Sequence, residues 1–198
     1  MAITIDTKLI CNSIFEAATP IIRIKGLESN MWHRDVPQTD GRYGPWKTAN
    51  YEILDEITWK QLKPCLYLVR AEDGELKYVG ISANRLKDRW RVSPAISYAN
   101  KSKLPVNQLF HSQCWKHIER EFSSNPSVRY EVRCIDGERL SQHLQRLGPP
   151  LSGFCTLADD HEGIVAAVER WMCNQSREGL ITWNIAMTGR ARRSRINN

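Results

Sequence analysis

The sequence predicts a fold of the α+β class. Two strand-like runs, CLYLV from residue 65 and KYVGIS from residue 77, flank an Asp-Gly pair that favours a β-hairpin of antiparallel strands. A third strand-like run lies at residues 128–135, and apolar residues recur at helical spacing between residues 159 and 174. Strands paired in a hairpin and followed by separate helices are typical of an α+β protein.

Length and charge indicate one soluble domain with an anionic partner. With 198 residues, of which 41% are hydrophobic and 25% charged, the chain can form a single core with appendages. Its formal net charge of +6 and pI near 9.1 favour nucleic acid, because Lys and Arg release counterions from phosphates. Many basic proteins bind no nucleic acid, so charge alone leaves the partner open.

The cysteines and the chain's first residues exclude other classes. No CxxC pair occurs, so we expect buried, reduced thiols rather than a zinc site or a disulfide framework. The first residues lack the pattern of a signal peptide and no apolar run reaches membrane-spanning length, so we expect a cytoplasmic protein. The cysteines are Cys11, Cys65, Cys114, Cys134, Cys155 and Cys173.

Residues 1–60 are predicted to form an N-terminal extension. It contains a helix or strand at 9–18, a strand at 21–25 and then an irregular loop rich in Gly, Pro and aromatic residues. The loop's aromatic and basic side chains either line a DNA surface or hold the loop against the core, and the sequence leaves both open. These residues are Trp32, His33, Arg34, Arg42, Tyr43, Trp46 and Lys47.

Turn and cap signals divide the rest of the chain. After the hairpin we expect a helix at 83–92 ended by Pro94, a helix at 106–122, the strand at 128–135, a short polar helix at 138–147, the helix at 159–174 and a basic tail at 188–198. The acidic ADDHEG sequence at the start of the 159–174 helix suits the helix dipole better than a metal site.

The hairpin separates into two faces. If Asp73 and Gly74 are the turn residues, Tyr67 lies opposite Gly80, and a glycine inside a strand often marks a close approach by another group. This register places Leu66, Leu68, Val79 and Ile81 on a core face and Tyr67, Tyr78 and Ser82 on the other. We therefore expect two phenols beside an open patch.

A guanidinium and a carboxylate accompany the phenols. In NRLKDRW, Leu86 and Trp90 can pack inward, and Arg89 then projects back over the hairpin. Glu169 lies at the edge of an apolar helical stripe, two turns after Glu162. Each position alone is ordinary, because tyrosine suits strands and a carboxylate at a stripe edge is usually solvated.

Together these positions resemble the GIY-YIG nucleases. CLY at 65–67, YVG at 78–80, Arg89, Glu169 and Asn184 occur in that family's order, with an eleven-residue step between the tyrosines and an asparagine fifteen residues after the glutamate. The resemblance covers roughly residues 63–186. It implies a small three-stranded antiparallel sheet flanked by helices in a nuclease domain at 61–187, with a helical insertion around 95–150.

The resemblance also implies phosphodiester hydrolysis with one Mg²⁺ or Mn²⁺. Glu169 would bind the metal, and Tyr67 would be the general base with Tyr78 hydrogen-bonding nearby. Arg89 would stabilise the charge that builds on the phosphate, and Asn184 would organise the site. A free phenol has a pKa of about 10, so Tyr67 needs the help of Arg89 and the metal to act near neutrality.

The sequence departs from the family at several points. Cys-Leu-Tyr replaces Gly-Ile-Tyr, Val79 replaces an isoleucine, and Ser93 stands where many members have a histidine. His111 or His117 from the insertion could compensate, but neither is assigned a catalytic role. The details of proton transfer are therefore open.

DNA is the expected partner. Arginines of the tail either grip phosphates or solubilise the chain. The sequence is compatible with a restriction-like, phage or mobile-element endonuclease, with a structure-specific repair nuclease, or with a non-catalytic module of the same fold. Cutting both strands requires a homodimer or sequential nicking. The expected DNA-contacting residues are Gly80, Ser82, Arg85, Lys87, Arg91, Arg190, Arg192, Arg193 and Arg195.

Overall fold

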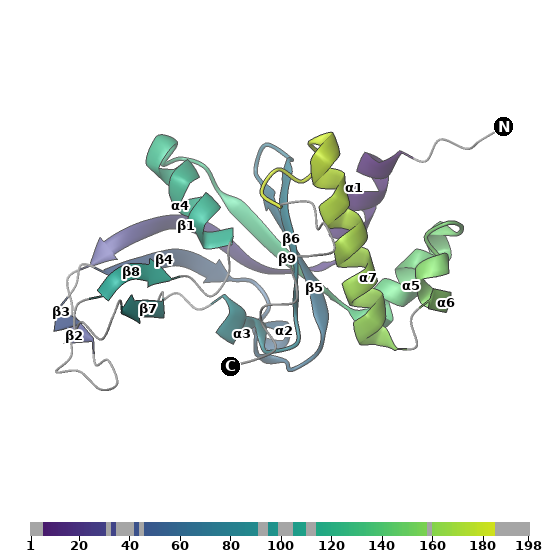
Figure 1. Cartoon of the computed structure of the whole chain (residues 1–198), viewed down its shortest axis with the longest axis horizontal. Helices are drawn as coiled ribbons and strands as arrows, with labels where there is room; N and C mark the ends of the chain where they lie inside the picture. The colour runs from purple at the N-terminus through teal and green to yellow at the C-terminus, as the bar shows by residue number, and fades with distance from the viewer. Residues whose placement is uncertain are drawn as a thin grey trace.

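A five-stranded antiparallel sheet forms the centre of the computed structural model (Figure 1). The structure describes residues 6–30, 33–34, 42–43, 46–90, 95–98, 105–109, 114–157 and 160–184. The strand order is β4 (Trp46–Ile53), β1 (Thr19–Asn30), β9 (Tyr130–Asp136), β5 (Cys65–Ala71) and β6 (Leu76–Ser82). β6 is therefore an edge strand.

The expectation of three strands was wrong. β9, β5 and β6 are the three expected strands, and the N-terminal segment adds β1 and β4 to the same sheet. β1 pairs with β9 and buries Ile21, Ile22 and Ile24. This pairing covers an edge of β9 that would otherwise expose unpaired backbone groups, a demand that local sequence does not reveal.

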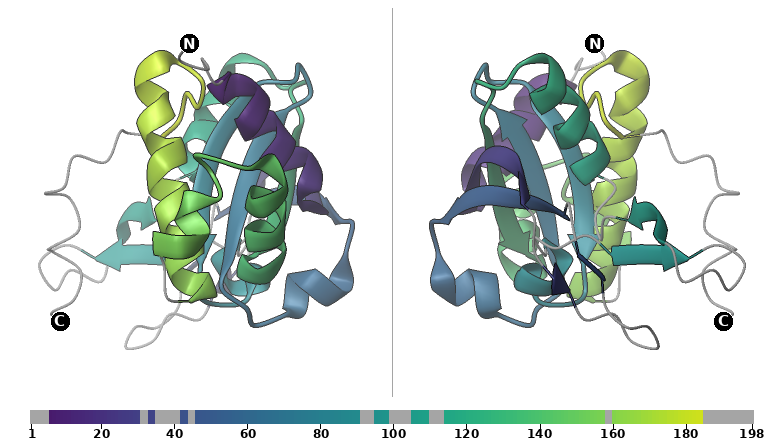
Figure 2. Two further views of the ribbon diagram at one scale, coloured as in Figure 1. Left: turned by 90° about the vertical axis from the view of Figure 1, so that its right-hand side faces the viewer. Right: turned by 90° about the vertical axis from the view of Figure 1, so that its left-hand side faces the viewer.

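Three longer helices cover one face of the sheet (Figure 2). They are α1 (Thr7–Ala17), α5 (Gly137–Leu147) and α7 (His161–Asn174), with the short α6 (Gly153–Leu157) beside them and the 3₁₀ turn η1 (Gln175–Glu178) after α7. Asp6, Asp136 and Asp160 cap the three longer helices by accepting backbone hydrogen bonds. The predicted polar helix and last helix are confirmed.

The other face is buried as well, under α2 (Glu56–Lys60), α3 (Leu86–Arg89) and α4 (Cys114–Ser124). Its core is rich in aromatic side chains. They include Trp59, Tyr67, Trp90, Trp115, Phe122, Tyr130 and Trp183. α4 lies over this side of the sheet (Figure 2). Tyr67 is completely buried and Tyr78 is partly buried, so the expected open patch is closed at Tyr67.

The segment at 95–150 is not only helical. α4 begins at Cys114, whereas a helix was expected from 106, and Pro105–Leu109 forms strand β8 paired with β7 (Ala95–Tyr98). Of the helix expected at 83–92, the structure describes the single turn α3, and residues 91–94 lie outside the described ranges. Two residue pairs within the predicted loop, β2 (His33–Arg34) and β3 (Arg42–Tyr43), also form a short ladder.

The cysteines and the helices can be compared with the expectations of buried thiols and of no membrane-spanning segment. All six cysteines lie within the described ranges as free thiols, and all but Cys155 are buried, as expected. Within the same ranges, no helix combines the length and apolarity needed to cross a membrane.

Candidate active site

The β5–β6 hairpin has the predicted register at the tyrosines. Tyr67 pairs with Gly80 and Val69 with Tyr78, as expected. The turn itself has three residues rather than two, because the amide of Ala71 bonds to Glu75 and Gly74 adopts a φ of +89°. A one-residue shift between Val69 and Arg70 then restores the predicted pairing beyond the turn.

Gly80 allows the Tyr67 ring to cross its strand. A Cβ atom at position 80 would lie 2.6 Å from both Cζ and Oη of Tyr67, closer than any side chain tolerates. The ring stacks on Tyr78 with centroids 6.1 Å apart and meets the edge of Trp90 at 5.5 Å. Tyr67 has 0% exposure, so its position is closely determined. The predicted close approach at Gly80 is confirmed.

Arg89 reaches the phenol of Tyr67. α3 anchors itself through buried Leu86 and the following buried Trp90, as the sequence predicted. Arg89 Nε then donates a 3.1 Å hydrogen bond to Tyr67 Oη. Burial disfavours the charge on Arg89, but Tyr67, Tyr78 and Glu169 outweigh it and raise its pKa. The guanidinium therefore remains a full positive charge beside the phenol.

Glu169 supplies the opposite charge from α7. The apolar stripe of this helix packs against β5 and β6, and Glu169 at its edge is only 6% exposed. Its carboxylate lies close enough to Arg89 to raise the pKa of that residue. Glu162, earlier on the helix, is exposed, and Asp160 accepts a hydrogen bond from the Gly163 amide. Asp160 thus caps the helix, whereas Glu169 joins the site.

The two phenols have different environments. Burial, reinforced by interaction with Tyr67, raises the pKa of Tyr78 far above that of a free phenol. Tyr78 therefore stays protonated near neutral pH and can donate a hydrogen bond. Tyr67 is completely buried and accepts a hydrogen bond from the guanidinium of Arg89, so a negative charge on its oxygen would have a cation beside it.

Asn184 attaches itself to the edge of β6. Its side chain accepts a 2.8 Å hydrogen bond from the Val79 amide and donates another of 2.8 Å to the Val79 carbonyl. Its Nδ2 also lies 3.2 Å from Cys173 Sγ on α7. Asn184 thus fixes α7 to the strand that carries Tyr78 and Gly80. Such contacts suit the organising role predicted for it rather than a direct part in chemistry.

Five sequence-predicted positions therefore converge from separate elements. Comparison with protein-family models, curated proteins and solved structures found no significant match. The relation to the GIY-YIG nucleases accordingly remains a resemblance, carried by Tyr67, Tyr78, Arg89, Glu169 and Asn184.

The expected DNA-contacting residues divide into three groups. Gly80 and Ser82 are buried, Gly80 beneath the Tyr67 ring and Ser82 with its hydroxyl bonded to the Asn84 carbonyl, so neither presents a surface to DNA. Arg85 and Lys87 are exposed at and within α3, beside Arg89. The remaining members lie outside the described residues. These are Arg91, Arg190, Arg192, Arg193 and Arg195.

The histidines considered as substitutes differ in placement. His117 on α4 is half-buried and stacks on Trp183 with centroids 5.4 Å apart and an interplanar angle of 11°. Ser93 and His111 lie outside the described residues. The structure thus offers His117 as a neighbour of the 183–184 segment.

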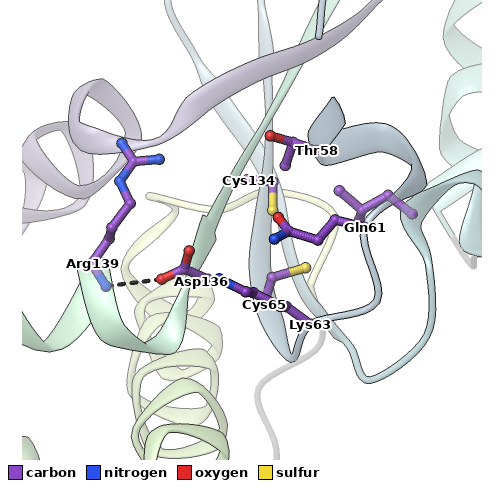
Figure 3. A pocket seen from close by; sticks show the side chains of 8 residues that line it. Thr58, Gln61, Lys63, Cys65, Cys134, Asp136 and Arg139 are labelled. Carbon is purple, nitrogen blue, oxygen red and sulfur yellow. Dashed lines mark hydrogen bonds between the residues drawn. The ribbon is translucent and has the colours of Figure 1, made fainter. Parts of the chain in front are cut away.

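A small pocket near the first residue of β5 is separate from these residues (Figure 3). Cys65 and Cys134 lie on its wall, and Asp136 at its rim accepts a 2.9 Å hydrogen bond from the Arg139 amide. Thr58, Gln61, Lys63 and Leu86 complete the lining. None of the five converging residues contributes to this pocket.

Among the described residues, no group of three or more His, Cys, Asp and Glu side chains is arranged to hold a metal ion. A metal at the candidate site would therefore rest on the single carboxylate of Glu169. Mg²⁺ suits such a site, because it commonly binds one or two carboxylates and keeps water and substrate phosphate as its other ligands.

The sequence did not indicate that α4 contributes to the candidate site. Cys114 and Trp115 pack on the tyrosine side of the sheet, and Glu121 bonds to Tyr130 and Trp183. The apolar spacing of Trp115, Ile118 and Phe122 identifies a buried helical face. No local pattern indicates which face of the sheet that helix covers.

Proposed function

We propose that the chain is a metal-dependent DNA endonuclease that hydrolyses phosphodiester bonds. The observation that carries this proposal is the hydrogen bond from Arg89 to Tyr67, with the buried carboxylate of Glu169 acting on the same guanidinium. A phenol, a cation and an acid from three different elements can supply a general base, charge stabilisation and a metal ligand for the hydrolysis of a phosphodiester by water.

Each side chain has a distinct task in this proposal. Tyr67 takes a proton from the attacking water, and the Nε–H of Arg89 stabilises the phenolate at 3.1 Å. Tyr78 remains neutral and orients Tyr67 by hydrogen bonding. Because the planar fork of a guanidinium matches phosphate oxygens, Arg89 would also stabilise the negative charge that builds on the phosphate.

Glu169 would hold one Mg²⁺ or Mn²⁺ through a hard carboxylate oxygen. When bound, the ion supplies positive charge to the phosphate oxygens and lowers the pKa of a bound water. Water and substrate phosphate would provide the other ligands of an ion held by one carboxylate. Glu169 is only 6% exposed and acts electrostatically on Arg89, so its carboxylate lies within the candidate site.

DNA is the proposed substrate because the protein carries a net charge of +6 and exposes Arg85 and Lys87 next to Arg89. Phosphate contacts from these residues would position the duplex without reading its sequence. Restriction-like and structure-specific cutting both remain within the proposal, and so do a homodimer and sequential nicking by one chain.

Nicking of supercoiled plasmid in Mg²⁺ or Mn²⁺ tests the proposal. Glu169→Gln, which keeps the volume of the buried side chain, should reduce the nicking rate at least about 100-fold, because it removes the metal's anionic ligand. Arg89→Ala should have a similar effect, and the double variant should lose less than the product of both, since the residues serve one step.

Glu162→Gln is the matched control, because Glu162 lies exposed on the same helix and its change alters net charge equally. It should cleave like the unmodified protein. Retention of full activity by Glu169→Gln and by Arg89→Ala would show that the assignment of the site is wrong.

The complete burial of Tyr67 favours a second candidate, a non-catalytic nucleic-acid-binding module. A general base must contact the water that it deprotonates, and Tyr67 has no exposed surface in this conformation. DNA binding by the unmodified protein without metal-dependent cleavage would support this alternative. If cleavage occurs, mapping the ends on linear and branched DNA separates sequence-specific from structure-specific cutting.

A further inference from the structure

Glu121 of α4 connects three groups that lie far apart in the sequence. Its Oε1 accepts a 3.0 Å hydrogen bond from the indole of Trp183, and its Oε2 accepts one of 2.5 Å from the phenol of Tyr130. Lys77 Nζ lies 3.8 Å from Oε1. Tyr130, Trp183 and Lys77 are all buried, and Lys77 Nζ also pairs with Glu75 at 2.5 Å, so the carboxylate of Glu121 chiefly provides acceptors for the two buried ring donors.

Trp183 and its neighbour lead directly to the candidate active site. The Trp183 amide donates a 2.9 Å hydrogen bond to the Lys77 carbonyl, and Asn184 binds both backbone groups of Val79. Residues 77 and 79 flank Tyr78 on the edge strand. The segment 183–184 therefore holds the backbone of β6 on either side of Tyr78, and Glu121 holds that segment.

The first turn of α4 packs against the residues of the candidate active site on the Tyr67 face of the sheet. Trp115 meets Trp90 edge-on at 5.5 Å, and Trp90 in turn meets Tyr67. Cys114 is buried on the same face, close enough to Arg89 and Tyr78 for electrostatic interaction with both. α4 is thus positioned by Glu121 near one end and supports the phenols and Arg89 near the other.

We propose that Glu121 is a positioning residue for the cleavage reaction, acting through Trp183 and the edge of β6 on Tyr78 and through α4 on Arg89. This inference rests on the proposed endonuclease function. Glu121 contacts neither DNA nor metal in this role. It holds the groups that do, and small misplacements of such groups reduce turnover strongly.

Steady-state cleavage of a short DNA duplex by Glu121→Ala and Glu121→Gln tests the inference. Glu121→Ala should reduce kcat roughly 10- to 100-fold with KM changed less than about threefold, because positioning of catalytic groups is lost while the phosphate-binding surface remains. Glu121→Gln should restore most of kcat. Its amide oxygen can accept from Trp183, and its amide nitrogen can donate to Tyr130 Oη.

Glu138→Ala is the matched control, because Glu138 is exposed on α5 and its removal changes net charge by the same amount. It should keep kcat and KM. Amide hydrogen exchange on the unmodified protein and Glu121→Ala gives a readout independent of activity. Exchange at Tyr78, Val79 and Gly80 should accelerate in Glu121→Ala, while exchange in β1 stays unchanged.

Three outcomes overturn the inference. The first is an unchanged kcat in Glu121→Ala alongside loss of cleavage in Glu169→Gln, which leaves the endonuclease proposal intact. The second is unchanged exchange at residues 78–80 in Glu121→Ala, which counts against the inference even if the unmodified protein cleaves no DNA. The third is a Glu121→Gln variant as impaired as Glu121→Ala, which contradicts a role through hydrogen bonding.

Discussion

The missing side chain at Gly80 decides where the Tyr67 ring lies. Because a Cβ at Gly80 would be 2.6 Å from two ring atoms, Gly80→Ala must displace a ring confined between Tyr78 and Trp90. We expect a loss of about 1–3 kcal/mol in the free energy of unfolding, the range typical of overpacking. Urea denaturation monitored by circular dichroism measures it.

Gly26→Ala provides the comparison for Gly80→Ala. Gly26 also lies in a strand of the main sheet, but a Cβ atom at this position would have no neighbour within 4 Å beyond the adjoining residues of the chain. Its substitution should change stability by less than about 0.5 kcal/mol. Equal losses at both glycines would mean that strand geometry, rather than the Tyr67 contact, explains the effect.

Individual residues could be predicted where chemistry and spacing coincide. The pairing of Tyr67 with Gly80 and the inward packing of Leu86 and Trp90 followed from strand and helix periodicity. The burial of Tyr67 itself did not follow, because it depends on Trp90 and on α4, whose Trp115 packs against Trp90 on that face of the sheet.

Among the elements, α1 is attached to the sheet by charge and aromatic contacts. The ring of Phe15 lies under two guanidinium groups, with Arg70 Cζ at 4.0 Å and Arg133 Cζ at 4.5 Å from its centroid. Glu16 pairs with the same two arginines. Since Glu16 is largely exposed, its ion pairs contribute little, and the completely buried Phe15 ring contributes more to the docking of α1.

A second attachment of α1 depends on pH. His143 on α5 bonds to Ser13 Oγ at 3.0 Å, and burial, with a smaller effect of Arg146, lowers the pKa of His143 below its ordinary value of 6.5. The folded state therefore binds this proton less readily than the unfolded state does. The stability contributed by neutral His143 is complete above pH 6.5 and falls as the pH drops from 6.5 to the lower folded-state pKa.

Replacing His143 by Asn should flatten this decline in the free energy of unfolding. Urea denaturation at intervals between about pH 5 and 8 measures the slope. His161→Asn is the control, because His161 is exposed, and it should leave the slope unchanged. A slope that survives in His143→Asn would assign the pH dependence to other groups.

For the whole molecule, the N-terminal segment belongs to the sheet. β1 pairs with both β4 and β9, and its isoleucines Ile21, Ile22 and Ile24 are buried in the tyrosine-side core. A chain that begins at residue 61 would expose the edge of β9 and lose these apolar contacts. We expect such a chain to show no cooperative unfolding transition, as measured by far-UV circular dichroism during heating.

A truncated chain that unfolds cooperatively would instead establish residues 61–187 as an independent domain, as the sequence suggested. The structure favours the first outcome because the sheet continues without interruption from β6 to β4. The site depends on this continuity, since β5 is held between β9 and β6.

By itself the sequence determined the hairpin, its register at Tyr67 and Tyr78, the capped helices α5 and α7, and the five residues that meet at the candidate site. These features depend on turn chemistry and on periodicities of two and 3.6 residues, which act over short stretches. Only the tertiary structure decided that the sheet has five strands, that Tyr67 is buried, and that Glu121 links α4 to Trp183 and Tyr130. Those features depend on contacts between segments that are distant in the sequence, and local sequence patterns do not indicate which segments pack on the same sheet.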